Sequence, residues 1–495
     1  MREDVGPQPP QTPRQDRVGL LCALAVSLAS TLAFALLLRQ RSHFQADDFL
    51  VFHDVFTQSL AQFLLQPTDV HFIPLYRLAS LFIYSIAPLD FDLALAVMGT
   101  LHLLSVWMLY RTLDLLSPSL LNGPLTVLWG TSLYVGVILL WWSAGIERFA
   151  CILLSIAAVQ QFVKFRTTGS VARLVMSGVC LVLASAFFSK GLLIPGLLGA
   201  VELALLPDTP RRKLTRNLAA IGALGGVAVA YRILSNLVTA DTFHSQPVNV
   251  AEQLEGLRLA GMILSQGMAG LLWSHPLSAG NWLVLGIWFA CFLASVLVDR
   301  FNAVIWALGV SMVAVNFLAI TLSPRMMFGL AIVAVERYYA DVIFVVVLFA
   351  KLLAERMTRK MTVPTGRRLY AGVAIAWVAV LLVPAQSQET FRQILTLPLY
   401  VQSPLKWAYV ENLKGDLAEI RTKDTGILRF APGAAPIWLL GLVHAVGDYS
   451  KFLPIFDRAV EVSEDGVCVY RVGADGKIEK PPTACSVASD GSSIP

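Results

Sequence analysis

The sequence predicts an all-α polytopic membrane protein with about eleven transmembrane helices and a small extracytoplasmic α+β region at its C-terminus. Three observations lead to this fold class. Of the 495 residues, 56% are hydrophobic and only 14% are charged, whereas about 25% of an ordinary soluble domain is charged. Apolar runs near the length of a transmembrane helix recur along the chain. Most basic residues lie in short loops between these runs, so the net charge of +5 indicates orientation rather than nucleic-acid binding.

The apolar runs follow a polar, Pro- and Gln-rich segment, residues 1–17, which we expect to be disordered and cytoplasmic. Residues 18–38 form the first run, which spans a bilayer and exceeds the core of a signal peptide. Ten further runs predict the remaining transmembrane helices: residues 91–110, 120–142, 146–163, 171–188, 192–206, 218–237, 282–298, 303–322, 339–353 and 369–383. Residues 75–87 are too short to cross, and the polar side chains of residues 257–273 indicate an interfacial or re-entrant segment.

The basic loops set the predicted orientation, because cytoplasmic loops are rich in Lys and Arg. These loops are residues 164–173, 211–216, 299–300 and 351–368. With the N-terminus inside, eleven crossings place all four in the cytoplasm and the C-terminus outside. The chain is then a multi-pass cell-membrane protein with a transmembrane domain (residues 18–385) and an extracytoplasmic C-terminal region (residues 386–495). Two further outer segments are residues 39–90 and 235–280.

The C-terminal region combines a helical stretch, residues 404–423, with short strand-like runs such as residues 467–471. Asp-Gly pairs at residues 465–466 and 475–476 predict turns between them. Cys468 and Cys485 fall in this region and, if it is extracytoplasmic, can form a disulfide.

Two adjacent carboxylates, Asp47 and Asp48, stand just outside the first helix. A carboxylate at this boundary is costly unless it is solvated, paired or used. One reading is therefore chemical: the group accepts a proton from an acceptor hydroxyl or binds a metal ion. The alternative reading is a solvated pair or a helix N-cap.

The same outer loop holds His71, Tyr76 and Arg77 around Pro74, which suits the first turn of a short helix. His71 titrates near neutral pH and can donate to an anionic oxygen. Arg77 offers a planar fork for phosphate. The competing interpretation is that these are polar residues satisfied within the loop.

Cations stand at two other helix ends on the predicted outer face. Lys190 lies in Ser189-Lys190-Gly191, where two helices meet with almost no loop. A half-buried ammonium there needs an anion, for which a lipid phosphate is suited, unless it only snorkels to headgroups. Arg337, next to Tyr338, can hold a phosphate bidentately or serve as an interface anchor.

An outer turn is expected at residues 141–148, between two transmembrane helices. Trp141 and Trp142 fit an aromatic belt. Glu147 is a substrate-binding candidate, with pairing to Arg148 as the alternative. No nucleotide-binding motif is suitably placed and no cytoplasmic loop could hold a nucleotide domain, so a substrate at the outer face must arrive without a nucleotide. A lipid-linked donor meets that requirement.

Taken together, the motifs resemble the polytopic GT-C glycosyltransferases, particularly bacterial relatives of protein O-mannosyltransferases and aminoarabinose transferases. The resemblance covers the chain to about residue 385 and rests on four elements: Asp47-Asp48 in the first outer loop, His71 with Pro74, Ser189-Lys190-Gly191, and Arg337-Tyr338. The third element departs from the Ser-Lys-Glu motif of that superfamily, because Gly191 stands where the Glu would be.

This resemblance implies an inverting transfer of a sugar from a polyprenyl-phosphate donor, at the outer face, to an acceptor glycan, lipid or protein. It implies that Asp48, slightly favoured over Asp47, deprotonates the acceptor, and that a divalent ion such as Mg²⁺ or Mn²⁺, if one is used, binds one of the two. The further roles that it implies are phosphate binding or orientation by Lys190, Arg337, Arg77 and His71, and substrate binding by Tyr76, Tyr338 and Glu147.

Three other functions compete with this one. A lipid or sugar transporter or flippase would place charges at mid-membrane and often has paired broken helices. A non-catalytic assembly protein would need no cluster of Asp, His, Lys and Arg outside the membrane. An O-antigen-ligase-like enzyme would place its chemistry in a large late outer loop.

Overall fold

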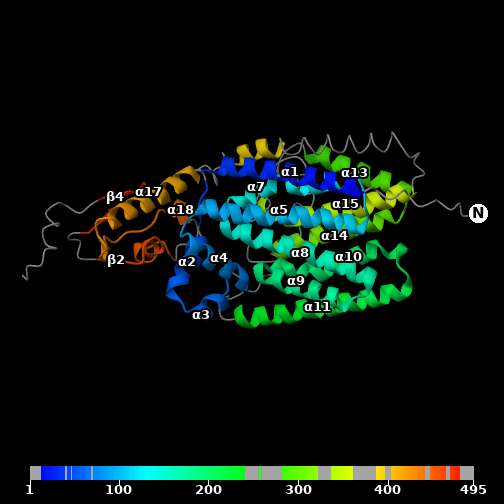
Figure 1. Ribbon diagram of the computed structural model, residues 1–495, viewed down its shortest axis with the longest axis horizontal. Helices are drawn as coiled ribbons and strands as arrows, with labels where there is room; N and C mark the ends of the chain where they lie inside the picture. Colours follow the sequence, from blue (N-terminus) through cyan, green and yellow to red (C-terminus); the bar gives the residue numbers. More distant parts are fainter. Residues whose placement is uncertain are drawn as a thin grey trace, which may run out of the picture.

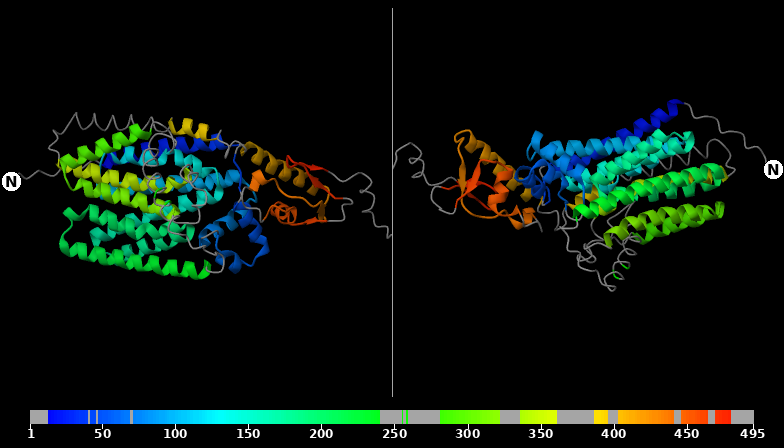
Figure 2. Two further views of the ribbon diagram at one scale, coloured as in Figure 1. Left: turned by 180° about the vertical axis from the view of Figure 1, so that it is seen from behind. Right: turned by 90° about the horizontal axis from the view of Figure 1, so that it is seen from below.

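The computed structural model describes residues 13–39, 42–45, 47–68, 71–239, 281–321, 336–360, 386–395, 403–440, 446–463 and 469–479, with residues 255 and 258. Within these ranges, long helices run side by side along the long axis of the molecule (Figure 1). A smaller region with the few short strands extends from one end of this helical body, as both further views show (Figure 2). The predicted helical architecture with a small α+β region near the C-terminus is confirmed.

Five described segments are long and apolar enough to cross a membrane: Arg17–Leu38, Phe91–Leu116, Asn122–Leu139, Trp142–Thr168 and Arg211–Thr239. Three shorter apolar helices accompany them: Val171–Phe187, Leu285–Val298 and Asn302–Leu318. The multi-pass character is therefore supported, while the count of eleven crossings stays a prediction. The run at residues 369–383 lies outside the described residues, as does the run at residues 257–273 apart from Arg258.

The helical body is built from these elements: α1 (Pro13–Leu38), α5 (Phe91–Leu116), α6 (Asn122–Gly130), α7 (Leu133–Leu139), α8 (Trp142–Thr168), α9 (Val171–Phe187), η1 (Ser189–Leu193), α10 (Ile194–Ala204), η2 (Leu206–Asp208), α11 (Arg211–Thr239), α13 (Asn281–Val298), α14 (Asn302–Thr321), η4 (Glu336–Tyr338) and α15 (Ala340–Lys360). Two of the apolar runs that were predicted to be single transmembrane helices fold differently. Residues 120–142 are divided into α6 and α7 at Ser132, whose hydroxyl caps α7 by accepting from the Tyr134 N–H at 3.3 Å. Residues 192–206 give only the 11-residue α10, about 16 Å long, which is too short to cross alone.

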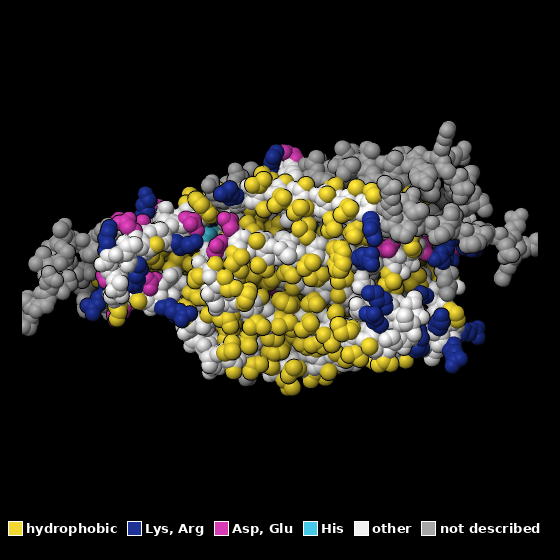
Figure 3. Space-filling view, viewed as in Figure 1, with side chains coloured by type: hydrophobic (Ala, Val, Ile, Leu, Met, Phe, Trp, Pro, Cys, Tyr) yellow, Lys and Arg dark blue, Asp and Glu magenta, His cyan; other side chains and the backbone are white. Residues whose placement is uncertain are grey.

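The two ends of the body differ in charge. One end, here the basic end, carries Arg166, Arg216 and the Arg211 start of α11. Buried Glu202 accepts from Arg166 at 3.0 Å there. Figure 3 shows Lys and Arg gathered at this end and a broad hydrophobic surface between it and the opposite end. This distribution is that of a protein whose middle faces lipid.

The opposite end, here the loop end, is formed by the segment between α1 and α5. It folds into α2 (Asp47–Thr57), α3 (Leu60–Leu65) and α4 (Pro74–Ile86). Pro74 begins α4, as its position in the sequence predicted, because a helix needs no N–H donor at that position. Ser59 and Gln62 form a capping box at α3.

The C-terminal region contains α17 (Ser403–Arg421), β1 (Leu428–Phe430), α18 (Ile437–Leu440), α19 (Tyr449–Phe452), η6 (Leu453–Ile455), β2 (Val460–Val462), β3 (Arg471–Val472) and β4 (Ile478–Glu479). β1 pairs in parallel with β2, and β3 pairs antiparallel with β4. Gly476, at φ +84°, supplies the turn between β3 and β4, as the Asp-Gly pair predicted. The other Asp-Gly pair, Cys468 and Cys485 lie outside the described residues.

The C-terminal region docks on the loop end. The Tyr84 hydroxyl donates to the Ile455 carbonyl at 2.7 Å, and Lys414 donates to the Leu89 carbonyl at 3.1 Å. The rings of Phe49 and Phe452 pack with centroids 5.4 Å apart. Apolar packing and hydrogen bonds thus hold the two segments together, although more than 300 residues separate them.

Candidate functional site

Most of the predicted site residues, Arg77 excepted, lie near the first two turns of α8, at the loop end. The sequence placed residues 141–148 in a turn, but α8 begins at Trp142, so Glu147 and Arg148 lie inside the helix. Trp141, at the N-cap, makes no side-chain cap. The capping acceptor comes instead from α2.

Asp48 is that acceptor. Its side chain is fully buried. One oxygen accepts the N–H of Ser143 in the first turn of α8 at 3.0 Å, and the other accepts the N–H of Gln45 at 2.9 Å. Burial raises the pKa of Asp48 well above its ordinary value. Asp48 therefore joins α2 to α8, a cap supplied across 95 residues of sequence.

Asp47 is only half-buried, in contrast to its neighbour. It stands close enough to Tyr76 to affect that phenol electrostatically, as do Asp48 and Glu147. Burial, followed by these three charges, raises the pKa of Tyr76 well above its usual value. The Tyr76 hydroxyl is buried beside the Ser80 side chain, and a hydrogen bond with Ser80 partly offsets this rise in the pKa. Three acidic side chains thus lie near one buried phenol.

His71 and the Ser189 motif meet although they are far apart in sequence. Nδ1 of His71 lies 2.9 Å from the Ser189 hydroxyl. Its ring packs edge-on against Phe188, with centroids 5.8 Å apart. This contact connects the loop between α3 and α4 to η1 and places His71 next to the residue that precedes Lys190.

Lys190 forms an ion cluster that the sequence did not predict. Its ammonium donates to Asp341 at 2.6 Å, and Nε of Arg148 lies 3.8 Å from the other oxygen of the same carboxylate. Arg148 is 3% exposed and also donates to the Ala144 carbonyl at 3.1 Å, but its Nε makes no hydrogen bond within the described part of the chain. Both cations, Lys190 and Arg148, pack against the Phe188 ring.

Arg337 and Tyr338 approach the same region from η4. The Arg337 guanidinium stacks on the Trp141 ring at 4.5 Å from its centroid and lies 5.4 Å from the Tyr338 ring. The Arg148 guanidinium lies 5.9 Å from the centroid of the same Tyr338 ring. Tyr338 therefore links the Arg337 position to the Lys190 cluster.

Arg77 is the predicted phosphate ligand that stands apart from these residues. It is 1% exposed. Its guanidinium pairs with Asp54 at 2.7 Å, donates to Thr68 at 3.3 Å, and stacks on the Phe63 ring at 4.4 Å. Arg77 thus already has partners that hold α2, α3 and α4 together, which is a structural role for its charge.

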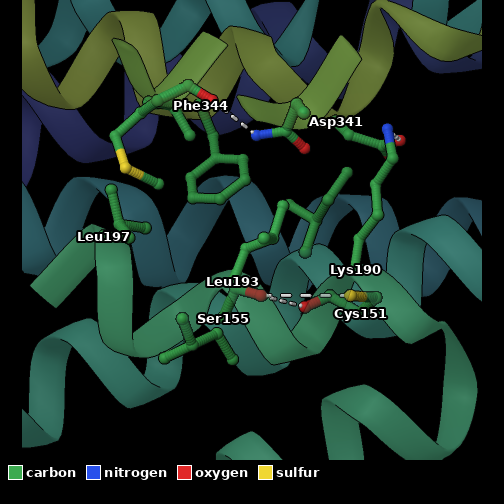
Figure 4. A pocket seen from close by; sticks show the side chains of 12 residues that line it. Cys151, Ser155, Lys190, Leu193, Leu197, Asp341 and Phe344 are labelled. Atoms are coloured by element: carbon green, nitrogen blue, oxygen red, sulfur yellow. Dashed lines mark hydrogen bonds and ion pairs between the residues drawn. The ribbon is translucent and has the colours of Figure 1, made fainter. Parts of the chain in front are cut away.

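A cavity of about 30 Å³ begins at the ion cluster and continues into the helical body (Figure 4). In Figure 4, the Lys190 side chain reaches from its own segment across to Asp341 on α15. The lining is mostly apolar and comes from α8, η1, α10, α14 and α15: Cys151, Ile152, Ser155, Lys190, Leu193, Ile194, Leu197, Met312, Asn316, Asp341, Phe344 and Val345. A cavity of this volume has room for about two water molecules.

Metal ligation is not supported by a cluster in the described ranges, where no three His, Cys, Asp or Glu side chains are grouped to hold an ion. Both oxygens of Asp48 already accept backbone N–H groups. The divalent metal at Asp47 or Asp48 stays a prediction.

Sequence reasoning missed Asp341 and the role of Arg148. A signal for Asp341 was present, because a carboxylate that opens an apolar helix needs a partner. The identity of that partner depends on how α15 packs beside η1.

Comparison with known proteins finds no match, neither among models of protein families nor among curated proteins.

Proposed function

We propose that this protein is a membrane glycosyltransferase that moves a sugar from a polyprenyl-phosphate donor to an acceptor at the outer face of the cytoplasmic membrane, with inversion. One observation carries the proposal. Two cations and one carboxylate, Lys190, Arg148 and Asp341, form a buried cluster near the start of α8, the helix that also carries Glu147. Lys190 and Asp341 of this cluster line a small, mostly apolar cavity. A lipid phosphate suits the cations, and a carboxylate nearby suits an acceptor hydroxyl.

The reaction assigns a different role to each group. The acceptor oxygen bonds to the anomeric carbon of the sugar while the bond from that carbon to the phosphate oxygen breaks. The acceptor proton passes to a carboxylate. The bonding electrons leave with the polyprenyl phosphate, which gains one negative charge. Lys190 and Arg148 stabilise this charge, and they do so most strongly in a site poor in water.

Asp47 is the better candidate for the base, in contrast to the expectation from sequence. Asp48 is fully buried and uses both oxygens on backbone N–H groups. Asp47 is half-buried, so an acceptor hydroxyl can reach it. In this proposal Asp48 is a positioning residue that fixes α2 against α8.

His71 and Tyr338 complete the proposed site. His71 hydrogen-bonds Ser189 beside Lys190 and can orient the donor from that side. The Tyr338 ring, which contacts Arg337 and Arg148, is placed to stack on the sugar. Arg77 is not assigned to the phosphate here, since Asp54 already neutralises it.

The test is a transfer assay with membranes that contain the protein and a panel of labelled polyprenyl-phosphate sugars, following label into protein, glycan and lipid fractions. We expect Asp47→Asn to lower transfer by about 100-fold or more, because the proton loses its acceptor. Asp92→Asn is the matched control, since Asp92 is an exposed carboxylate in the first turn of α5. Wild-type activity in Asp47→Asn rejects this base, and no transfer by the wild type from any donor rejects the donor class.

A further inference from the structure

We propose that Asp341 sets the net charge of the phosphate site and thereby makes the protein favour a singly charged phosphodiester over a doubly charged phosphomonoester. The inference rests on the proposed function, because it concerns the ligand of the same site. It goes beyond that function by assigning a specificity role to a residue that no sequence motif identified.

The geometry centres on one carboxylate between two cations. Asp341 lies in the first turn of α15, and its side chain is 7% exposed. It contacts Lys190 at 2.6 Å and Arg148 at 3.8 Å, whose side chains are 10% and 4% exposed. All three charges are therefore largely removed from water, where electrostatic interactions are strongest.

The charges of this cluster do not cancel. Lys190 and Arg148 contribute two positive charges and Asp341 one negative charge, which leaves one positive charge. Among the residues that line the cavity, only Lys190 and Asp341 are charged, and Arg148 contacts Asp341 from outside this lining. Arg337 lies outside this cluster and stacks on Trp141 and Tyr338. A buried excess charge is unfavourable without a counter-ion, and Arg148 retains a buried Nε with no hydrogen bond to a described residue. Both facts indicate an anionic ligand with one charge.

The two lipid species of the proposed reaction differ in this property. A polyprenyl-linked sugar phosphate is a diester with one negative charge. The polyprenyl phosphate that leaves is a monoester with nearly two charges at neutral pH. A carboxylate beside the phosphate repels the second charge and so weakens binding of the product more than binding of the donor. Asp341 would thus favour donor entry and product release.

The experiment measures ligand binding and needs no transfer. Purified protein in detergent is titrated with geranylgeranyl phosphate and with its methyl ester, a diester, and the dissociation constants are obtained from tryptophan fluorescence. We expect Asp341→Asn to tighten monoester binding by about tenfold or more and diester binding by clearly less. An unchanged ratio of the two constants overturns the inference.

Two further variants make the result specific. Glu202→Gln is the matched control, because Glu202 is another buried carboxylate paired with an arginine, at the basic end, and its loss should leave the ratio unchanged. Lys190→Gln removes a positive charge and should shift the ratio of the two dissociation constants toward tighter relative binding of the diester. If Asp341→Asn does not fold, this variant still tests the charge rule, namely that the net charge of the cluster decides between monoester and diester. A ratio that shifts in Glu202→Gln, or does not shift in Lys190→Gln, contradicts the charge rule.

The outcomes separate this inference from the proposed function. If both lipids bind the wild type and Asp341→Asn leaves their ratio unchanged, only the role of Asp341 is wrong. If neither lipid binds the wild type, the polyprenyl-phosphate donor is contradicted as well.

Discussion

At the scale of single residues, Asp47 and Asp48 show how neighbours acquire different roles. Adjacent residues at the start of a helix point in different directions, so Asp48 faces α8 while Asp47 stays half-buried. The buried position gives Asp48 two backbone donors and a raised pKa. A residue held in this way is suited to fixing geometry, and a more accessible one is suited to proton transfer.

Asp48→Asn is expected to make stability less dependent on pH. Because burial raises the native pKa of Asp48 above its ordinary 3.8, the native state binds the proton more tightly than the unfolded state. The free energy of unfolding contributed by Asp48 therefore falls as pH rises through the window above 3.8 and is greatest below it. The loss of one acceptor to a backbone N–H costs about 1 kcal/mol.

The measurement is the Tm of the wild type and of Asp48→Asn between about pH 4 and about pH 8. The Tm of the wild type should exceed that of the variant by more at the acidic end of this range than at the alkaline end. A difference that is constant across the range would contradict the assigned pKa shift. Asp92→Asn, which alters an exposed carboxylate, should show little change in Tm at any pH.

At the scale of elements, the packing of η1 explains why residue 191 is a glycine. A Cβ at residue 191 would lie 2.6 Å from the carbonyl carbon of Ala184, and closer still to the N of Ser185. The end of α9 therefore leaves no room for a side chain there. The close packing brings Lys190 back toward α8 and α15, so the position requires glycine for a steric reason.

Gly191→Ala should displace Lys190 and lower transfer by about tenfold or more, since small shifts of a charged group carry large rate costs. Gly196→Ala is the control, because its added Cβ would meet only Met312, at 3.9 Å. Both variants are compared by transfer rate and by Tm. Equal activity of Gly191→Ala and the wild type would show that the close packing does not position Lys190.

The docking of the C-terminal region on the loop end includes a contact between a buried histidine and a partly exposed glutamate. His43 is fully buried, and burial lowers its pKa from 6.5. Its Nε2 lies 3.6 Å from the carboxylate of Glu411 on α17. His43 and Lys414 lower the pKa of Glu411 to about 2. Released from this contact, His43 would take up a proton more readily.

Acid should therefore weaken the docking. As pH falls through about 6.5, His43 binds a proton in the undocked state but not in the docked state. Glu411 contributes to the stability of the docked state at higher pH, and this contribution is lost only as pH falls below about 4.5 toward 2. Hydrogen exchange of α2 and α19, corrected for intrinsic rates, should be faster at about pH 5 than at about pH 7. His43→Gln should reduce this difference, and an unchanged difference would exclude His43 as its cause.

At the scale of the whole molecule, the separation of charge predicts orientation. Basic residues gather at the end opposite the C-terminal region (Figure 3), and cytoplasmic ends of membrane proteins are rich in Lys and Arg. We expect a cysteine from Lys423→Cys, in the C-terminal region, to react with an impermeant maleimide in intact cells. A cysteine from Arg212→Cys, in α11, should react only after permeabilisation. The native cysteines are replaced by serine in both variants, and the reverse labelling pattern would invert the proposed orientation.

Much of the architecture followed from local patterns. Apolar length and charge predicted the helical body, Pro74 predicted the start of α4, and the Asp-Gly pair at residues 475–476 predicted a turn. These features depend on each residue and its near neighbours. The break between α6 and α7 and the short α10 were not foreseen, because apolar composition alone does not show where a helix ends.

The sequence by itself determined that this protein is a helical membrane protein with ionisable residues gathered at helix ends, because hydropathy and backbone preference are properties of short segments. Only the tertiary structure decided which charges meet. The cap from Asp48 to Ser143 and the pairing of Lys190 with Asp341 join residues 95 and 151 positions apart. Such contacts are set by how the helices pack, and packing depends on surfaces that are complete only when the whole chain has folded.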